Sequence, residues 1–447
     1  MRKSHVGPGF AWAHRRTGFS GLPPLSGLPP LSGLPPVSGL HAIRPGGGFG
    51  ALRARPLPRL LARIGSLGRF DWIALSAVLG LGVTGLLLVS SATRVALMQA
   101  GADPLTYVKK QLLNLVIGLI LMLTVGLLDH RKLREYSPLA YIAALVGLLA
   151  VLSPLGTSVN GARAWISLPG GFQVEPSEYA KLGLILMTAR VLGDVRTADR
   201  RPGFLDVAIA LACAVPVIGP VAAEPALGVT VLLMILLAGL IVLSGTRLRW
   251  LALLGAAAGG VLLGAWWLHL LKPYQLQRLA AFVNPGADPS GAGYSAAQAK
   301  MAIGSGGLLG QGLLHGQLVA GNFVPEQHTD FIFTVAGEEL GFVGAVIIIG
   351  LLGIVVARAL LIAARADDQF GTLVAGGIAI WFAVQSFINI GMTIGIAPVT
   401  GLPLPFVSYG GSAMIADMLA VGVLQSIHRR QSHFPVSRSA AKDASNK

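Results

Sequence analysis

Long apolar stretches alternate with shorter polar segments along most of the chain after residue 70. Most stretches hold about twenty residues, which is the length that an α-helix needs to cross the hydrocarbon core of a bilayer. The stretches are continuously apolar rather than alternating, which excludes a transmembrane β-barrel. Ten spans are predicted, over residues 72–92, 111–129, 138–156, 178–193, 204–222, 226–244, 249–271, 331–357, 370–393 and 405–427. The pattern therefore predicts an all-α polytopic membrane protein.

Composition and charge placement agree with this prediction. Of the 447 residues, 53% are hydrophobic and only 12% are charged, whereas soluble proteins carry about 25% charged residues. Most lysines and arginines fall in segments that ten crossings place on the side of the N-terminus, as expected for cytoplasmic loops. Both termini are therefore predicted to be cytoplasmic. The net charge of +15 reflects topology rather than nucleic-acid binding.

The chain divides into one membrane domain and two tails. Residues 1–69 are rich in Arg, Gly and Pro and repeat the sequence S-G-L-P-P-[LV] three times. Such a segment cannot build an apolar core, so it is predicted to be a disordered basic cytoplasmic tail. Residues 70–430 are predicted to form the membrane domain, and residues 431–447 a second cytoplasmic tail. The long segment 272–330 falls outside the membrane, and long ordered loops in compact proteins are usually functional.

Several motifs stand out against the apolar background. They are N-G-A-R-A-W-I (160–166), E-P-S-E-Y-A-K-L (175–182), N-P-G-A-D-P-S-G-A-G-Y (284–294), A-I-G-S-G-G (302–307), F-V-P-E-Q-H-T-D-F-I-F (323–333) and P-V-T-G-L-P-L-P-F-V-S-Y-G-G-S (398–412). Together they resemble the SEDS family (shape, elongation, division and sporulation), the polytopic peptidoglycan glycosyltransferases represented by RodA and FtsW. The resemblance covers residues 70–430, which is nearly everything but the tails.

This resemblance implies an enzyme that polymerises lipid II on the outer face of the plasma membrane. In the family, the sugar chain of one lipid-linked disaccharide is transferred to the 4-hydroxyl of another, and undecaprenyl pyrophosphate is released. The motifs at 302–307 and 323–333 are more similar to the RodA branch, which implies a role in cell elongation and shape maintenance beside a class B penicillin-binding protein, a transpeptidase. The alternatives are a division role of the FtsW type, a lipid II flippase or transporter, and a non-catalytic scaffold.

Asp288 is the predicted catalytic residue. The acceptor hydroxyl is a poor nucleophile and needs a positioned base, and the essential acidic residue of the family falls at this position. The prolines and glycines around Asp288 fix a turn in the outer loop. A turn-capping role before Pro289 is the structural alternative.

Other polar residues are candidates for binding the substrate, because the leaving pyrophosphate needs cations or helix N-termini to take up its charge. The candidates are Arg278, Gln298, Lys300, Glu178, Lys181, His328, Asp330 and Glu338. For each, a loop charge or a structural ion pair is the alternative. Gln298 and Lys300 are expected on a short helix, and Glu178 and Lys181, three residues apart, are expected to share a helix face.

Absences and departures narrow the hypothesis. No second His or Cys lies at ligand spacing from His328, so no metal site is predicted from protein ligands. A divalent cation that assists the reaction remains an open alternative. The chain lacks G-x-x-x-x-G-K-[ST], so ATP is not the expected energy source.

Glu175 stands where the family usually has Gln, and Ala226 where it usually has Asp.

Overall fold

Helices account for all ten predicted spans. The computed structural model describes residues 69–159, 162–169, 172–197, 202–224, 226–267, 280, 282, 284 and 291–431. The two predicted tails therefore lie almost entirely outside the described residues. The helices at these positions are α2 (Trp72–Gln99), α3 (Thr106–Gly126), α4 (His130–Leu152), α5 (Pro176–Thr197), α6 (Phe204–Ala223), α7 (Leu227–Leu243), α8 (Leu248–Trp267), α13 (Gly341–Ala364), α14 (Gln369–Ile394) and α15 (Gly411–His428).

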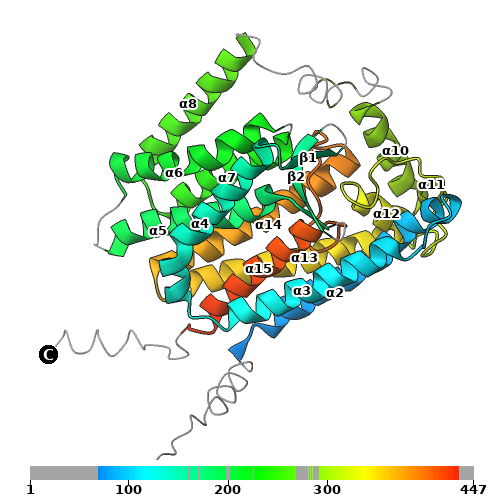
Figure 1. Ribbon diagram of the computed structural model, residues 1–447, viewed down its shortest axis with the longest axis horizontal. Helices are drawn as coiled ribbons and strands as arrows, with labels where there is room; N and C mark the ends of the chain where they lie inside the picture. The colour runs from blue at the N-terminus through cyan, green and yellow to red at the C-terminus, as the bar shows by residue number, and fades with distance from the viewer. Residues whose placement is uncertain are drawn as a thin grey trace, which may run out of the picture. The chain divides into compact units, whose positions relative to one another are not determined.

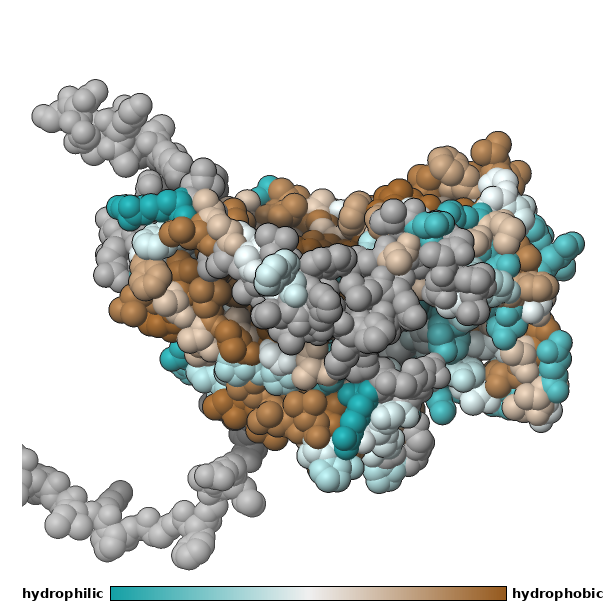
Figure 2. Space-filling model, turned by 90° about the horizontal axis from the view of Figure 1, so that it is seen from above, coloured by the Kyte–Doolittle hydropathy of each residue, from teal (hydrophilic) through white to brown (hydrophobic). Residues whose placement is uncertain are grey.

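The all-helical membrane architecture is confirmed. Seven helices within the described ranges (α2, α3, α4, α6, α13, α14 and α15) are each long and apolar enough to cross a membrane, and α7 is a shorter apolar helix. In α14 and α15 the apolar window is 72% buried, against 28% in α3, α4 and α13. Helices α14 and α15 therefore form the centre of the bundle (Figure 1), and the more exposed helices present apolar side chains outward (Figure 2).

The helix pairs join both consecutive and distant parts of the chain. Helix α15 packs against α3, α4 against α5, and α13 against both α14 and α2. Helix α5 also contacts α14, so these two meet in the core, where Trp381, Phe382 and Leu184 are fully buried. Helix α8 packs chiefly against α7 and stands at the edge of the bundle (Figure 1).

The end of the bundle that carries the long outer loop has structure of its own. Three short helices lie there, α10 (Ala292–Ser305), α11 (Gln317–Ala320) and α12 (Ile332–Glu339), and Figure 1 shows them together. Helix α10 is the short helix expected to carry Gln298 and Lys300, and this expectation is confirmed. A three-stranded antiparallel sheet, with the order β1-β2-β3, lies between α4 and α5 and was not predicted. Its strands are β1 (Gly156–Val159), β2 (Ala162–Leu168) and β3 (Phe172–Val174).

Two predicted spans differ from the structure in detail. The predicted span 331–357 is not one helix, because the chain breaks between α12 and α13, where Gly341 has a φ of 66°. A Cβ at Gly341 would lie 2.2 Å from the backbone nitrogen of Gly310, so the break depends on two glycine backbones in close approach. The predicted span 405–427 begins later, at Gly411, because the residues before it are not helical.

Close helix packing depends on Gly422 of α15. A Cβ there would lie 2.7 Å from the carbonyl oxygen of Met122 and 3.0 Å from its Cα, both backbone atoms of α3. Small residues allow this approach between membrane helices. Gly350 of α13 is the opposite case, since no atom lies within 4 Å of the position that its Cβ would take.

We therefore expect Gly422→Ala to destabilise the protein and Gly350→Ala to leave it unchanged or slightly more stable. Overpacking typically costs about 1–3 kcal/mol, whereas Ala in an open helical position gains up to about 1 kcal/mol over Gly. Thermal unfolding of both purified variants in the same detergent measures the difference. Equal melting temperatures would show that α3 and α15 can separate at this point without cost.

Candidate active site

At the end of the bundle that carries α10, α11 and α12, helices α14 and α15 are joined by residues 395–410, called here the connecting segment, which is not helical. Leu402, Leu404 and Phe406 in this segment are buried, and Phe406 has a φ of 64°, unusual for an aromatic residue. Non-helical backbone at membrane depth persists only where other groups of the protein satisfy its hydrogen bonds. The connecting segment therefore needs partners from the surrounding helices.

Two amide side chains of α14 supply the first partners. Gln385 Nε2 donates to the carbonyl oxygen of Pro403 at 2.8 Å, and Asn389 Nδ2 donates to that of Leu402 at 2.7 Å. Asn389 Nδ2 also donates to the backbone carbonyl of Asp330 at 2.7 Å. Both amides are fully buried. They join the connecting segment to the end of the long outer loop.

Polar groups from α3, from α15 and from the segment itself complete the set. Gln111 Nε2 donates to the carbonyl oxygen of Ser408 at 3.0 Å. Asp417 Oδ2 accepts the backbone N–H of Phe406 at 3.2 Å, and the Ser408 hydroxyl accepts that of Leu404 at 2.8 Å. The segment thus has a fixed shape although it contains no regular secondary structure.

A buried ion pair supports Gln385 from the other side. Lys181 Nζ donates to Glu178 Oε2 at 2.6 Å and to Gln385 Oε1 at 2.9 Å. The Lys181 ammonium also lies 4.8 Å from the centroid of the Trp381 ring. The side chains of Lys181 and Glu178 are 0% and 2% exposed. The expected common face is confirmed, and the enclosure favours a structural ion pair over direct contact with substrate.

Lys300 and Asp330 lie beside the connecting segment, and Gln298 lies on the same helix as Lys300. Helix α10, which carries Gln298 and Lys300, packs against α14. A Cβ at Gly395 would lie 3.4 Å from Lys300 Nζ, and one at Gly401 would lie 3.3 Å from Asp330 Oδ2. Both glycines have positive φ, 84° and 75°. An exposed cation and a half-buried carboxylate therefore border the same short stretch of chain.

His328 belongs to an aromatic cluster. Its ring centroid lies 5.0 Å from that of Tyr107 and 5.7 Å from that of Tyr409, and its carbonyl oxygen accepts the Tyr409 N–H at 2.9 Å. Burial lowers the pKa of the His328 imidazole, which favours the neutral ring. The described residues contain no group of three or more His, Cys, Asp or Glu side chains that could hold a metal ion. His328 thus ties the outer loop to α3 and the connecting segment.

Glu338 holds the outer loop by its backbone. Its two carboxylate oxygens accept the N–H groups of Leu318 and Val319, in α11, at 2.8 and 3.0 Å. Its neighbour Glu339 accepts a hydrogen bond from the Ser91 hydroxyl of α2. Both glutamates are at most 1% exposed. Their contacts fit a structural role better than the substrate-binding role considered for Glu338.

The predicted base lies outside the described residues, as does the candidate Arg278. Asp288 comes shortly before α10 in the sequence, which begins at Ala292. The structure therefore describes the residues that follow this motif in the sequence from Gly291 onward, among them Gln298, Lys300 and Asp330.

Comparisons with known proteins agree with these features. The family model described as "Cell cycle protein" (FtsW, RodA and SpoVE) matches residues 71–433. The peptidoglycan glycosyltransferase MrdB of Escherichia coli (strain K12) is 41% identical over 347 residues, 76% of this chain and 90% of MrdB. This chain belongs to the SEDS family.

Other SEDS relatives are similar over most of the chain. The probable peptidoglycan glycosyltransferase FtsW of Trichlorobacter lovleyi is 35% identical over 84% of this chain and 97% of its own length. The crystal structure of the rod shape determining protein RodA from Thermus thermophilus matches with a TM-score of 0.59, at 29% identity, over 82% of this chain and 98% of that one. A chain from a peptidoglycan synthase complex matches with a TM-score of 0.68, at 31% identity, over 82% and 99%.

The substitution of Glu175 for the usual SEDS glutamine is chemically mild. Burial, with a smaller contribution from Glu178, raises the pKa of the Glu175 carboxyl to about 8. This shift favours the protonated, uncharged form of the carboxyl, which resembles glutamine. Its carboxyl accepts the Ser177 hydroxyl at 2.8 Å, and its backbone N–H donates to the Ser412 hydroxyl at 2.8 Å.

The second departure, Ala226, occupies the N-cap position of α7 and makes no side-chain cap hydrogen bond. An aspartate is among the best residues at this position, and its replacement by alanine typically costs about 0.5–2 kcal/mol. With alanine at this position, the first turn of α7 has no side-chain cap.

Sequence reasoning missed the amides and the acid that hold the connecting segment: Gln111, Gln385, Asn389 and Asp417. A signal was present, because polar residues inside apolar spans are costly and usually paired or functional. Their partners are backbone groups of other segments, 11 to 297 residues away in the sequence, and gave no such signal.

We expect Lys181→Met to destabilise the bundle strongly, since it leaves the Glu178 carboxylate buried without its cation. Breaking one side of a buried pair typically costs about 3–5 kcal/mol. The double variant Glu178→Gln/Lys181→Met should recover much of this loss, because no buried charge remains. Thermal unfolding in detergent measures both.

The control is Lys109→Met, which removes an ion pair whose lysine and aspartate side chains are 67% and 48% exposed. It should leave stability unchanged, since exposed pairs contribute little. If Lys181→Met unfolds no more readily than this control, the buried pair is not structural and a substrate role regains support.

Proposed function

We propose that this SEDS protein polymerises lipid II into glycan strands on the outer face of the plasma membrane during cell elongation, with Asp288 as the catalytic base. Its family is that of the peptidoglycan glycosyltransferases, and the chain is a multi-pass membrane enzyme of this kind. The similarity to MrdB and to RodA supports the elongation role, and the similarity to FtsW keeps division as the alternative.

The observation that carries the proposal is the ordered connecting segment together with the charged side chains beside it, in the part of the chain that follows the Asp288 motif in the sequence. The connecting segment is fixed by buried amides, and Lys300 and Asp330 border it at Gly395 and Gly401. A cation at the membrane surface suits a pyrophosphate leaving group, whose charge grows as its bond to the sugar breaks. Pre-organised groups in this position would bind the lipid-linked substrate without rearrangement.

The proposed reaction is a single displacement. Asp288 accepts the proton of the acceptor 4-hydroxyl as its oxygen attacks the anomeric carbon of the donor sugar. The bond from that carbon to the pyrophosphate oxygen breaks, and undecaprenyl pyrophosphate leaves with the bonding electrons. Lys300 is the proposed cation for the leaving group.

We also propose that the protein acts beside a class B penicillin-binding protein. The related chain in the solved peptidoglycan synthase complex comes from a study of coordinated polymerization and crosslinking. A crosslinking partner follows for this chain by that similarity.

Transport of lipid II is a second candidate function. The buried Glu178–Lys181 pair and the non-helical connecting segment are features that transporters also use. Transport does not require a base at Asp288, so substitution there separates the two functions.

We expect Asp288→Asn to lower polymerisation by at least about a hundredfold, because general-base catalysis typically supplies about 10²–10⁴-fold in rate. Purified protein, with and without its transpeptidase, is incubated with lipid II, and glycan polymer is scored on a gel. Asp103→Asn is the matched control, because it makes the same change at an exposed aspartate between α2 and α3 that has no proposed catalytic role. It should leave polymerisation unchanged.

Near-normal polymer from Asp288→Asn would remove Asp288 from the catalytic role, since an asparagine serves almost as well as a turn cap. Loss of polymer with normal transport of lipid II across vesicles would assign this residue to polymerisation alone. No polymer from the unaltered protein with its partner present would favour the transporter or the scaffold.

Orientation is tested by labelling single cysteines in intact cells with an impermeant thiol reagent. The background variant is Cys213→Ser, which removes the only cysteine. We expect labelling at Ser158→Cys, on an exposed position of β1, and at Ser290→Cys, but not at Ser445→Cys. Permeabilised cells should label at all three positions. The reverse pattern in intact cells would invert the proposed topology.

A further inference from the structure

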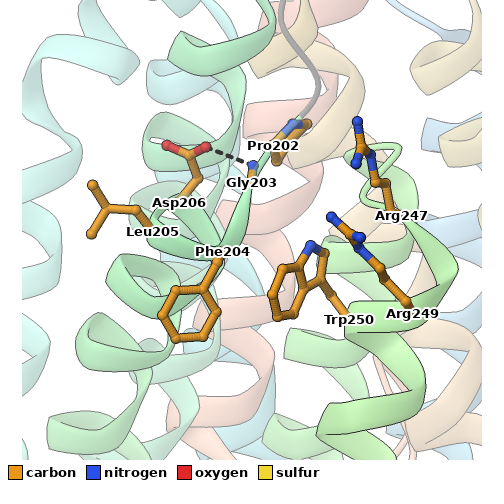
Figure 3. Close-up of a pocket in the computed structure, with 8 residues that line it drawn as sticks. All are labelled: Pro202, Gly203, Phe204, Leu205, Asp206, Arg247, Arg249 and Trp250. Atoms are coloured by element: carbon orange, nitrogen blue, oxygen red, sulfur yellow. Dashed lines mark hydrogen bonds between the residues drawn. The ribbon is translucent and has the colours of Figure 1, made fainter.

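A cleft of about 380 Å³ opens where α6 and α8 begin, at the end of the bundle opposite the candidate active site. Figure 3 shows its walls: the first residues of α6 on one side, and the residues that lead into α8 on the other. Neither the catalytic proposal nor the family motifs use this cleft.

The α8 side of the cleft is cationic. Arg247 and Arg249 both line it, and Figure 3 shows their guanidinium groups on the same wall. The Arg249 guanidinium lies 5.1 Å from the centroid of the Trp250 ring, which holds it in place by a cation–π contact. Neither arginine forms an ion pair with another residue in the described part of the chain.

One acidic side chain, Asp206, also lines the cleft, but it is engaged elsewhere. Its Oδ2 accepts the backbone N–H of Gly203 at 2.7 Å, and its side chain is buried on the α6 side. Figure 3 shows the carboxylate turned toward Gly203 and away from the two guanidinium groups. The lining therefore keeps one net positive charge, with both cations on the wall opposite the acid.

The rim of the cleft is apolar and aromatic. The rings of Phe204 and Trp250 lie 5.1 Å apart between centroids. Phe204 and Leu205 are 63% and 68% exposed, and the exposed apolar face of α6 continues at Ile209 and Val215. Aromatic rings with this placement are typical of the boundary between hydrocarbon and headgroups. The cationic cleft is thus at the depth of lipid headgroups, next to a surface that suits acyl chains.

We propose that this cleft binds the phosphate of an anionic phospholipid, with Arg247 and Arg249 as its ligands and the acyl chains along the exposed face of α6. Arginine matches the geometry of phosphate oxygens and forms charge-assisted, often bidentate hydrogen bonds with them. A free phosphate would use the arginines but leave the apolar rim uncovered, so the observations favour the lipid. With the orientation proposed above, the lipid comes from the cytoplasmic leaflet.

The test is native mass spectrometry of the full-length protein in neutral detergent, titrated with phosphatidylglycerol or with phosphatidylcholine. The unaltered protein should retain phosphatidylglycerol preferentially. Arg247→Gln/Arg249→Gln should weaken its binding at least about tenfold, since a hydrogen bond to a charged group typically contributes about 1.5–3 kcal/mol. Arg249→Lys keeps the charge but loses the planar stack on Trp250. Its binding of phosphatidylglycerol should be weaker than that of the unaltered protein and stronger than that of the double variant.

The matched control is Arg131→Gln/Lys132→Gln, which removes two exposed cations from the same end of the bundle, at the start of α4. It should leave phosphatidylglycerol binding unchanged, and an excess of inorganic phosphate should not displace the lipid. Equal weakening in both double variants would show diffuse attraction and overturn the site. Complete displacement by inorganic phosphate, or equal retention of the two lipids, would overturn the lipid assignment.

Discussion

A peptide group that is buried away from water must have a hydrogen-bond partner, and this requirement shapes the centre of the protein. The connecting segment leaves helical structure inside the bundle, so its carbonyl and N–H groups lose their usual partners. Gln111, Gln385 and Asn389 donate to three of the carbonyl groups, and Asp417 and Ser408 accept two of the N–H groups. An amide suits this task better than a charged group, because it offers both donors and an acceptor without the cost of burying a full charge. The outer surface of the site depends on these three side chains.

The buried Glu178–Lys181 ion pair fixes the orientation of the Gln385 side-chain amide. The oxygen and nitrogen of a side-chain amide can exchange places by a 180° rotation of the group. The surrounding donors and acceptors decide which orientation is correct. Lys181 has donors alone, and so has the Trp381 indole, and both meet Gln385 Oε1. The Nε2 group must therefore face the carbonyl oxygen of Pro403. Buried ion pairs often add little to stability, but this one fixes the orientation of a hydrogen bond on which the connecting segment relies.

The parts that sequence could predict are those in which the information is local. Spans are encoded by continuous apolar runs, and the common face of Glu178 and Lys181 by their spacing. The break before α13 and the path of the connecting segment were not predictable in this way. The first requires Gly341 to meet Gly310, and the second requires Gln385 to meet Lys181, 204 residues away. The short strands between α4 and α5 have three to seven residues, too few for a periodic signal. The motif around Asp288 was recognised from its residue types, but its geometry falls outside the described residues.

The two ends of the bundle are connected through α8. This helix begins at the arginine-lined cleft and ends at Trp267, and Asp288 is the first acidic residue that follows in the sequence. A helix of twenty residues is about 30 Å long, so a small tilt about its first turn displaces its outer end by several times more than its inner end. Among the residues that the structure describes, helix α8 packs chiefly against α7, and few other contacts oppose such a tilt. A lipid phosphate held between Arg247, Arg249 and the start of α6 would oppose it at the inner end. The position from which the chain enters the outer loop would then depend on an interaction at the opposite membrane surface.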